Sequence, residues 1–298
     1  MSAWKLTGHA DKASVAAALD RHGEMEDWPP DTPVSGHEIA EDRPDEWVIE
    51  MYLPRKPTDR DMDALRDLFD GEAPTLAAEN LPDTDWVTES QKGVDPIREG
   101  RFHVHTPDHE PDPERVNFVI PASQAFGTGQ HETTAGCLAM LDLMKREGNV
   151  FPNHADIGTG TGLLAFAAMH LWPGAYATAS DIDPVCTGVL HDNAETNGVR
   201  LGVGRGRLTF TVADGVEDEL IQLRGPYDLL IANILAGPLA EMAEGFAGLV
   251  TPGGSVLLAG LLETQEPAVR AAYRRAGFRL SRRLVRGDWA ILWLRKRR

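Results

Sequence analysis

The pattern of hydrophobic and polar residues changes near residue 118. Beyond it, apolar runs predict buried strands at HADI, AYATASDI, LTFTV, YDLLIA and SVLLAG. Amphipathic stretches between these runs predict helices near residues 161–171, 184–196, 216–223, 235–249 and 264–276. Strands that alternate with helices indicate a mostly parallel sheet covered by helices. The chain closes differently, because FRLSRRLV and DWAILWLR, separated by Arg286 and Gly287, predict an antiparallel hairpin.

The first 90 residues predict a smaller α+β domain. AWKLTG, VSGHEI and EWVIEMYL alternate as strands do, and residues 11–22 have helical spacing. Thr58 begins a second helix, with Asp61 three residues later as in a capping box. A final short strand around 85–89 would complete a ferredoxin-like β-α-β-β-α-β order. We therefore predict this domain at residues 1–90, a Pro- and acid-rich linker at 91–117, and a larger domain at 118–298.

Composition narrows the classes of protein that fit. A chain of 298 residues with 42% hydrophobic and 25% charged residues is typical of folded globular proteins. No apolar run approaches the length of a membrane span, and the N-terminus lacks an apolar signal core. Cys137 and Cys186 lack metal-type spacing, so we expect neither a disulfide framework nor a metal site. We interpret His103 and His105 as surface or packing residues. These features predict a soluble cytoplasmic protein.

Charge is distributed unevenly along the chain. The net charge is −17, yet residues 270–298 contain 11 Lys and Arg residues against one carboxylate, Asp288. An acidic body repels free nucleic acid and favours a basic partner, such as a basic protein. The basic C-terminal end allows two interpretations. It is either a contact for ribosomal RNA or a solvated strand pair beside the acidic front of the chain.

A glycine-rich motif follows the first strand of the larger domain. It runs from Asp156 to Gly162 as DIGTGTG, with Gly158 and Gly160 at its centre. Glycines at a strand-to-helix turn let the backbone approach a ligand closely. A dinucleotide fingerprint requires a third glycine where this chain has Leu163. The G-x-G-x-G pattern is instead typical of enzymes that bind S-adenosylmethionine, so we predict Gly158 and Gly160 as cofactor contacts.

Three polar residues stand at the ends of later strands in the predicted sheet. Asp181 lies 23 residues beyond Gly158 and is predicted to accept hydrogen bonds from ribose hydroxyls. Asp214 would contact the adenine amino group, or is a plain turn aspartate. Asn233 would lie beside the reacting methyl group and orient an incoming amine, or is a helix N-cap.

A glycine-containing loop, AFGTGQHETT, precedes the sheet and continues into the helical sequence AGCLAMLDLM. Its position suggests a flap over the cofactor site, with Thr133 or Thr134 near the start of the helix. His131 would be either a catalytic base or a positioning residue.

Several motifs, in this order, resemble one family. They are AFGTGQHETT, DIGTGTGLLAFAA, SDIDP, DNAETNG, YDLLIANILAGPLAEMA, GGSVLLAGLLETQ and DWAILWLRK. The chain resembles the PrmA family of bacterial ribosomal protein methyltransferases, strongly over residues 118–296 and more weakly in front. This chain departs from the family loop A-F-G-T-G-T-H-P-T-T at Gln130 and Glu132, and IPASQ replaces the usual D-P-G.

The resemblance implies an α/β fold, a class I (Rossmann-like) S-adenosylmethionine-dependent methyltransferase domain behind a smaller ferredoxin-like domain that recognises the substrate. Thr134, Gly158, Asp181 and Asn233 fall on the family's cofactor-binding positions. The implied reaction is repeated methylation of lysine side-chain and N-terminal amines of large-subunit ribosomal protein eleven, free or on the ribosome. We hypothesise that Asn233 and local backbone carbonyls orient the amine and that water takes the proton.

Two other functions are compatible with the same sequence. One is methylation of a lysine in another protein, and the other is a non-catalytic ribosome-binding role for this fold. Transfer of label to a different protein would identify the first, and failure to bind S-adenosylmethionine would identify the second. A dehydrogenase fits least, because the third fingerprint glycine is absent.

Overall fold

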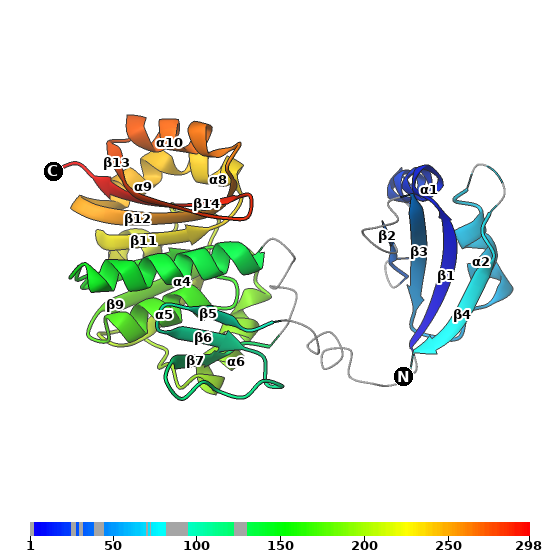
Figure 1. Ribbon diagram of the computed structural model, residues 1–298, viewed down its shortest axis with the longest axis horizontal. Coiled ribbons are helices and arrows are strands. Elements are labelled where there is room, and N and C mark those ends of the chain that lie inside the picture. The colour runs from blue at the N-terminus through cyan, green and yellow to red at the C-terminus, as the bar shows by residue number, and fades with distance from the viewer. Residues whose placement is uncertain are drawn as a thin grey trace. The chain divides into compact units, whose positions relative to one another are not determined.

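The chain forms two compact units, residues 1–89 and 90–298 (Figure 1). The structure is a computed structural model, and the residues that it describes are 3–24, 28–29, 32–38, 45–69, 71, 73–81, 95–121 and 130–298.

The first unit is built on a four-stranded antiparallel sheet. Its strand order is β2-β3-β1-β4, and the order along the chain is β-α-β-β-α-β, as in ferredoxin-like domains. Its elements are β1 (Ala3–Asp11), α1 (Lys12–Glu24), β2 (Val34–Glu38), β3 (Glu46–Leu53), α2 (Asp59–Arg66) and β4 (Leu76–Leu81).

Side chains from both helices close the core of this unit. Val15 of α1 and Leu65 of α2 are buried against Leu6 and Ile49 of the sheet. The capping box expected at the start of α2 is present, since the Asp61 carboxylate accepts from the Thr58 backbone N–H at 2.7 Å. That cap satisfies a backbone donor that the first helical turn leaves without a partner.

The edge strand β4 was not expected from the sequence. The strand predicted around 85–89 lies outside the described residues, whereas Leu76–Leu81 pairs antiparallel with β1. LAAENL contains no β-branched or aromatic residue, so its local preference does not favour a strand. Pairing with β1, from Ala3↔Leu81 to Gly8↔Leu76, makes it one.

The second unit contains a seven-stranded mixed sheet in the order β10-β9-β8-β11-β12-β14-β13. The first five strands in this order are parallel to one another. Strand β14 runs antiparallel to its neighbour β12, and β13 at the edge runs antiparallel to β14. The predicted strands and the closing hairpin are confirmed. The strands are β8 (Asn153–Ile157), β9 (Tyr176–Asp181), β10 (Leu208–Val212), β11 (Tyr227–Asn233), β12 (Val250–Leu262), β13 (Phe278–Arg286) and β14 (Trp289–Lys296).

Helices cover both faces of this sheet, as Figure 1 shows. Alternate residues of β11 enter different cores: Leu229 packs in the core of α4 and α5, and Leu230 in that of α8, α9 and α10. The predicted helix at 235–249 is interrupted at Met242, whose ψ is 1°. The helices are α4 (Gln130–Arg146), α5 (Leu163–Leu171), α6 (Cys186–Thr196), α7 (Glu219–Arg224), α8 (Ala236–Glu241), α9 (Ala243–Leu249) and α10 (Glu266–Arg275).

Most of the segment expected to be a linker is folded. Within residues 95–121, β5 (Ile97–Glu99), β6 (Phe102–His105) and β7 (Val116–Val119) form a three-stranded sheet. Phe102 and Val104 share one face of β6 and are buried in the core that contains α4 and α5. Burial of this apolar face explains why the segment is folded although the composition around it is rich in Pro and acidic residues.

The histidines of β6 are packing residues. His103 is fully buried and its Nδ1 lies 2.8 Å from Asn117 Oδ1, while His105 is 5% exposed and stacks on His103 at 4.8 Å between ring centroids. The described part of the chain contains no group of three or more His, Cys, Asp or Glu residues that could hold a metal ion. No helix within that part is long and apolar enough to span a membrane.

Candidate functional site

The glycine-rich motif forms the turn between β8 and α5. Gly158, Gly160 and Gly162 have φ angles of 71°, 53° and 85°, which glycine adopts at little cost. The Gly158 N–H donates to the Ser180 carbonyl at 2.8 Å, so the turn is fixed to the end of β9. A Cβ atom on Gly160 would have no atom within 4 Å, so this position faces open space.

Asp181 lies at the carboxyl end of β9, directly beside this turn. Its Oδ2 accepts from the Gly160 N–H at 2.8 Å, and its Oδ1 accepts from the Asp183 N–H at 3.0 Å. Each carboxylate oxygen has a second lone-pair direction available for another donor. These hydrogen bonds join the glycine turn to the Asp181 carboxylate, which is placed as a hydrogen-bond acceptor at the end of the sheet.

Asp156 supports the glycine turn from beneath and was not assigned a role from the sequence. It is fully buried, and its Oδ2 accepts from Thr159 Oγ1 at 2.6 Å and from the Ala165 N–H at 3.1 Å. Burial raises the pKa of its carboxyl to about 7, although these two hydrogen bonds act in the opposite direction. An acidic residue that opens a glycine motif at a strand end is the signal that could have identified it.

The buried Asp156 carboxyl gives a testable pH dependence. An unfolded Asp ionises near pH 4, so the folded state binds more protons between about pH 4 and 7, and this residue lowers stability as the pH rises. We compare the free energy of unfolding of the wild type with that of Asp156→Asn at each pH. The wild-type value minus the variant value should fall by about 4 kcal/mol as the pH rises over that range. Chemical denaturation at several pH values measures it, and parallel curves for the two proteins would contradict the assignment.

His154, two residues earlier on β8, acts in the opposite direction and explains why a difference measurement is needed. Burial lowers the pKa of its imidazole to about 4. Because the unfolded histidine binds a proton below about pH 6.5, this residue raises stability as the pH rises from about 4 to 6.5. The wild-type curve alone combines both effects, whereas the comparison with Asp156→Asn isolates the carboxyl.

Asn233 ends β11 and lies beside the first turn of α4. Its Nδ2 is 3.4 Å from Thr134 Oγ1, although the two residues are 99 positions apart in the chain. Asn233 and Thr134 are each half-buried, and Thr133 is 1% exposed. The carboxyl end of a central strand and the start of a helix thus bring an amide and a hydroxyl to one place.

These elements surround one cavity of about 770 Å³. Of the predicted site residues, Thr134, Gly158, Gly160, Asp181 and Asn233 all line it. Asp214 does not line this cavity and is exposed, so its contact with adenine stays a prediction. The wall also contains residues that the sequence analysis did not assign to the site: Leu163, Leu164, Ile182, Val185, Cys186, Val189, Ile234, Leu235, Gly260 and Trp289.

The cavity has two chemically different halves. On the β8 and β9 side lie the glycine turn, Asp181 and the apolar Ile182 and Val185, which are 64% and 65% exposed. On the other side lie Thr134, Asn233 and Trp289 with apolar neighbours, and no described lining residue there carries a carboxylate. The arrangement can hold a polar ligand at one end and present an uncharged hydrogen-bonding amide at the other.

Cys186 lines the first half of the cavity. Burial and the negative charge of Asp181 raise the pKa of its thiol to about 11, so it is protonated at neutral pH.

The loop expected to form a flap, residues 122–129, lies outside the described residues, as does the side chain of His131. The start of α4 that follows this loop is the part that reaches the cavity, through Thr133 and Thr134.

The sequence matches one protein family along nearly its whole length. A family model described as "Ribosomal protein L11 methyltransferase (PrmA)" matches residues 9–297. A protein of that name from Rhizobium meliloti (strain 1021) is 40% identical over 269 residues, which cover 89% of each chain. One from Agrobacterium fabrum is 38% identical over 271 residues, covering 89% of this chain and 90% of the relative.

A solved structure has a similar fold over about two thirds of this chain. The ribosomal protein L11 methylase from Lactobacillus delbrueckii subsp. bulgaricus aligns with a TM-score of 0.56 and 25% sequence identity. The alignment covers 68% of this chain and 99% of that one.

Proposed function

Because the chain belongs to the ribosomal protein L11 methyltransferase (PrmA) family, we propose that it methylates lysine side-chain and N-terminal amines of ribosomal protein L11 in the cytoplasm. S-adenosylmethionine is the methyl donor. The observation that carries the proposal is the single cavity that joins the glycine turn and Asp181 to Asn233 and Thr134.

The residues around the first half of the cavity fit an S-adenosyl group. Asp181 has acceptor capacity beyond its two backbone donors, as a ribose diol requires. The exposed side chains of Ile182 and Val185 offer apolar surface for a flat base, and Gly160 leaves the space beside it open. A volume of about 770 Å³ lies in the range of small-molecule sites.

When bound, S-adenosylmethionine supplies a methyl group that its sulfonium already makes electrophilic. The task of this chain is therefore to position an amine and to favour its neutral form. We place the Asn233 amide oxygen as an acceptor that orients the amine N–H, with the Asn233 amide itself held by its Nδ2 contact to Thr134 Oγ1. Apolar neighbours such as Ile234 and Leu235 reduce hydration of the ammonium and so lower its pKa.

Among the described residues that line the cavity, none on the Asn233 side carries a carboxylate that could take the proton. The acidic lining residues are Asp181, which ends β9, and Asp183 just after it, and Asp181 is already engaged by the glycine turn. Water is therefore the proposed proton acceptor. A nearby carboxylate would also stabilise the ammonium form, so its absence from this wall favours the nucleophile.

Asn233→Ala is expected to lower kcat by about 100-fold, because the amine loses the group that orients it. The dissociation constant for S-adenosylmethionine should change by less than about tenfold, since the Asp181 and glycine-turn contacts remain. Steady-state kinetics and calorimetric titration measure the two quantities separately. An unchanged kcat would remove Asn233 from the positioning role.

The substrate is tested with labelled S-adenosylmethionine, the purified protein and an extract that lacks this activity. We expect label on ribosomal protein L11, at lysine and N-terminal amines identified by mass spectrometry. Label on another protein would replace the substrate and leave the chemistry in place. Absence of label, together with absence of cofactor binding, would favour a non-catalytic ribosome-binding protein.

For substrate on the ribosome, the proposal includes a contact between the basic C-terminal end and ribosomal RNA.

A further inference from the structure

We propose that one surface of the second unit, remote from the cavity, binds the phosphate backbone of RNA. The surface, here called the arginine cluster, consists of Arg274, Arg275, Arg279, Arg297 and Arg298. The inference rests on the proposed function for its setting on the ribosome and identifies the residues that would make the RNA contact.

Three segments of the chain meet at the arginine cluster. Helix α10 ends at Arg275, and its Arg274 carbonyl accepts from the Gly277 N–H at 3.3 Å in the turn into β13. The C-terminal segment reaches the same turn, because the Arg297 N–H donates to the Gly277 carbonyl at 3.1 Å. All five arginine side chains are exposed. The fold thus gathers charges that are up to 24 positions apart in the sequence.

The positive charge of the arginine cluster is not neutralised within the described structure. Neighbouring Arg282 and Arg286 pair with Glu147 and Glu99, and Arg283 pairs with Glu266 at 2.7 Å. By contrast, the five cluster arginines form no ion pair with a carboxylate of the described residues. Arg279 Nη1 instead donates to the Phe278 carbonyl at 2.9 Å.

The remaining chain is strongly acidic. The whole chain has a net charge of −17 although residues 270–298 contribute 11 basic residues against Asp288 alone, so residues 1–269 carry a net charge of −27. A polyanion is therefore repelled by most of the protein and attracted at this end, which orients its approach.

The chemistry of the surface favours RNA over an acidic protein. Ten of the 11 basic residues in 270–298 are arginine, whose planar guanidinium binds phosphate through two hydrogen bonds and stacks on bases.

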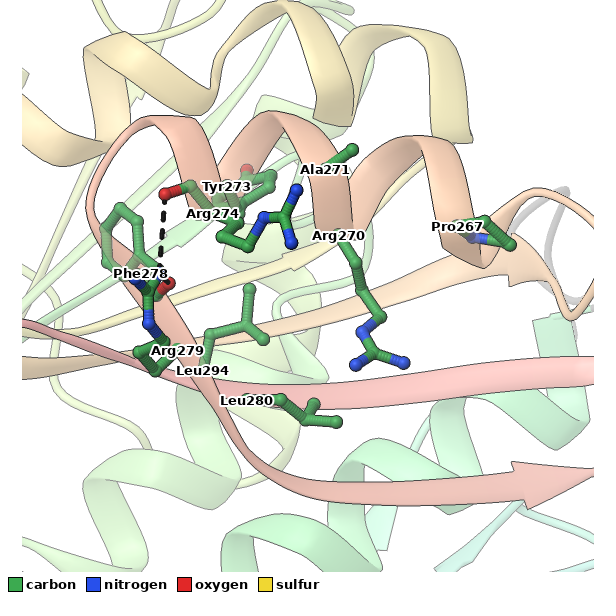
Figure 2. A pocket seen from close by; sticks show the side chains of 9 residues that line it. All are labelled: Pro267, Arg270, Ala271, Tyr273, Arg274, Phe278, Arg279, Leu280 and Leu294. Atoms are coloured by element: carbon green, nitrogen blue, oxygen red, sulfur yellow. Dashed lines mark hydrogen bonds between the residues drawn. The ribbon is translucent and has the colours of Figure 1, made fainter.

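A hollow of about 510 Å³ lies between α10 and β13. Figure 2 shows Arg274 on α10 and Arg279 at the start of β13, around the aliphatic Leu280 and Leu294. Arg270 of α10 also lines the hollow, but it pairs with Glu266 at 3.0 Å and is not part of the arginine cluster. Cationic groups beside aliphatic surface suit a phosphate and its attached nucleoside.

The arginine cluster and the cavity lie at opposite ends of β14. Trp289, the first residue of that strand, lines the cavity, while Lys296, its last, precedes Arg297 and Arg298. A strand of this length spans about 24 Å. RNA held at the arginine cluster therefore leaves the cavity open to the substrate protein.

The test measures binding of a fluorescently labelled 20-base-pair RNA duplex to the full chain without any methyl donor. We expect log affinity to fall with log salt concentration with a slope of about 4.5, because about five phosphates are neutralised. Arg274→Gln, Arg275→Gln and Arg279→Gln combined should weaken binding at least about tenfold at 0.1 M salt and reduce the slope by about 2.7. The matched control combines Arg98→Gln, Arg200→Gln and Arg207→Gln, which are exposed arginines of the same unit outside the arginine cluster.

The control triple variant should retain the wild-type slope, and both triple variants should keep the thermal unfolding midpoint and the S-adenosylmethionine affinity of the wild type. Equal losses in the two variants, or no binding of the duplex by the wild type at low salt, would overturn the proposal. Equally tight binding of polyglutamate would do so as well, since it would identify a general acidic partner. Failure of RNA binding with intact methyl transfer would overturn the RNA contact and leave the proposed methyl transfer standing, because separate assays measure the two activities.

Discussion

Asp181→Ala is expected to weaken the affinity for S-adenosylmethionine by about 100-fold or more. Two charge-assisted hydrogen bonds to ribose hydroxyls would be lost, at about 1.5 to 3 kcal/mol each. The glycine turn would also lose its anchor, because Asp181 Oδ2 accepts from the Gly160 N–H at 2.8 Å. Isothermal titration calorimetry on the purified chain measures the dissociation constant.

Asp192→Ala is the matched control for this prediction. Asp192 is an exposed aspartate of α6 in the same unit and does not line the cavity. The same chemical change there should leave the dissociation constant within about twofold of the wild type. Unchanged cofactor affinity in Asp181→Ala, with the variant folded, would remove the cofactor site from this end of the sheet.

Gly260→Ala is expected to lower the free energy of unfolding of the second unit by about 3 kcal/mol. Gly260 has a φ of 84°, and a Cβ atom there would stand 2.3 Å from the Ile234 carbonyl oxygen. Backbone atoms cannot give way as a flexible side chain can, so β12 or the segment after Asn233 must move. Because both line the cavity, cofactor affinity should fall together with stability.

Gly248→Ala provides the opposite case with the same substitution. Gly248 lies in α9, and a Cβ atom there would meet nothing within 4 Å. Alanine is the better helix former, so this variant should be more stable than the wild type by about 0.5 to 1 kcal/mol. Urea denaturation measures both variants. Equal effects at the two positions would contradict the close packing of Gly260 against Ile234.

The fold of the second unit could be predicted because its signals are local. Apolar runs such as YDLLIA separate buried strands from amphipathic helices, and the hairpin of FRLSRRLV and DWAILWLR interrupts the pattern visibly. Positive φ angles at Gly158 and Gly160 explain why the motif needs glycine at those spacings. Family resemblance added the substrate class, which no local pattern contains.

Features that depend on distant partners were missed. β4 is a strand because it pairs with β1, although LAAENL has no strand preference of its own. The segment from 95 to 119 looks like a linker in composition, yet Phe102 and Val104 bury one face of its sheet. Trp289 reaches the cavity only because β14 pairs beside β12.

We propose above all that this chain transfers methyl groups from S-adenosylmethionine to amines of ribosomal protein L11. The most direct test incubates purified, unmethylated ribosomal protein L11 with the chain and S-adenosylmethionine, and follows the intact mass of the substrate. We expect stepwise mass increases by whole methyl groups on lysine and N-terminal amines, and none with Asp181→Ala. An unchanged substrate mass, with wild-type protein that is folded and binds the cofactor, would contradict it.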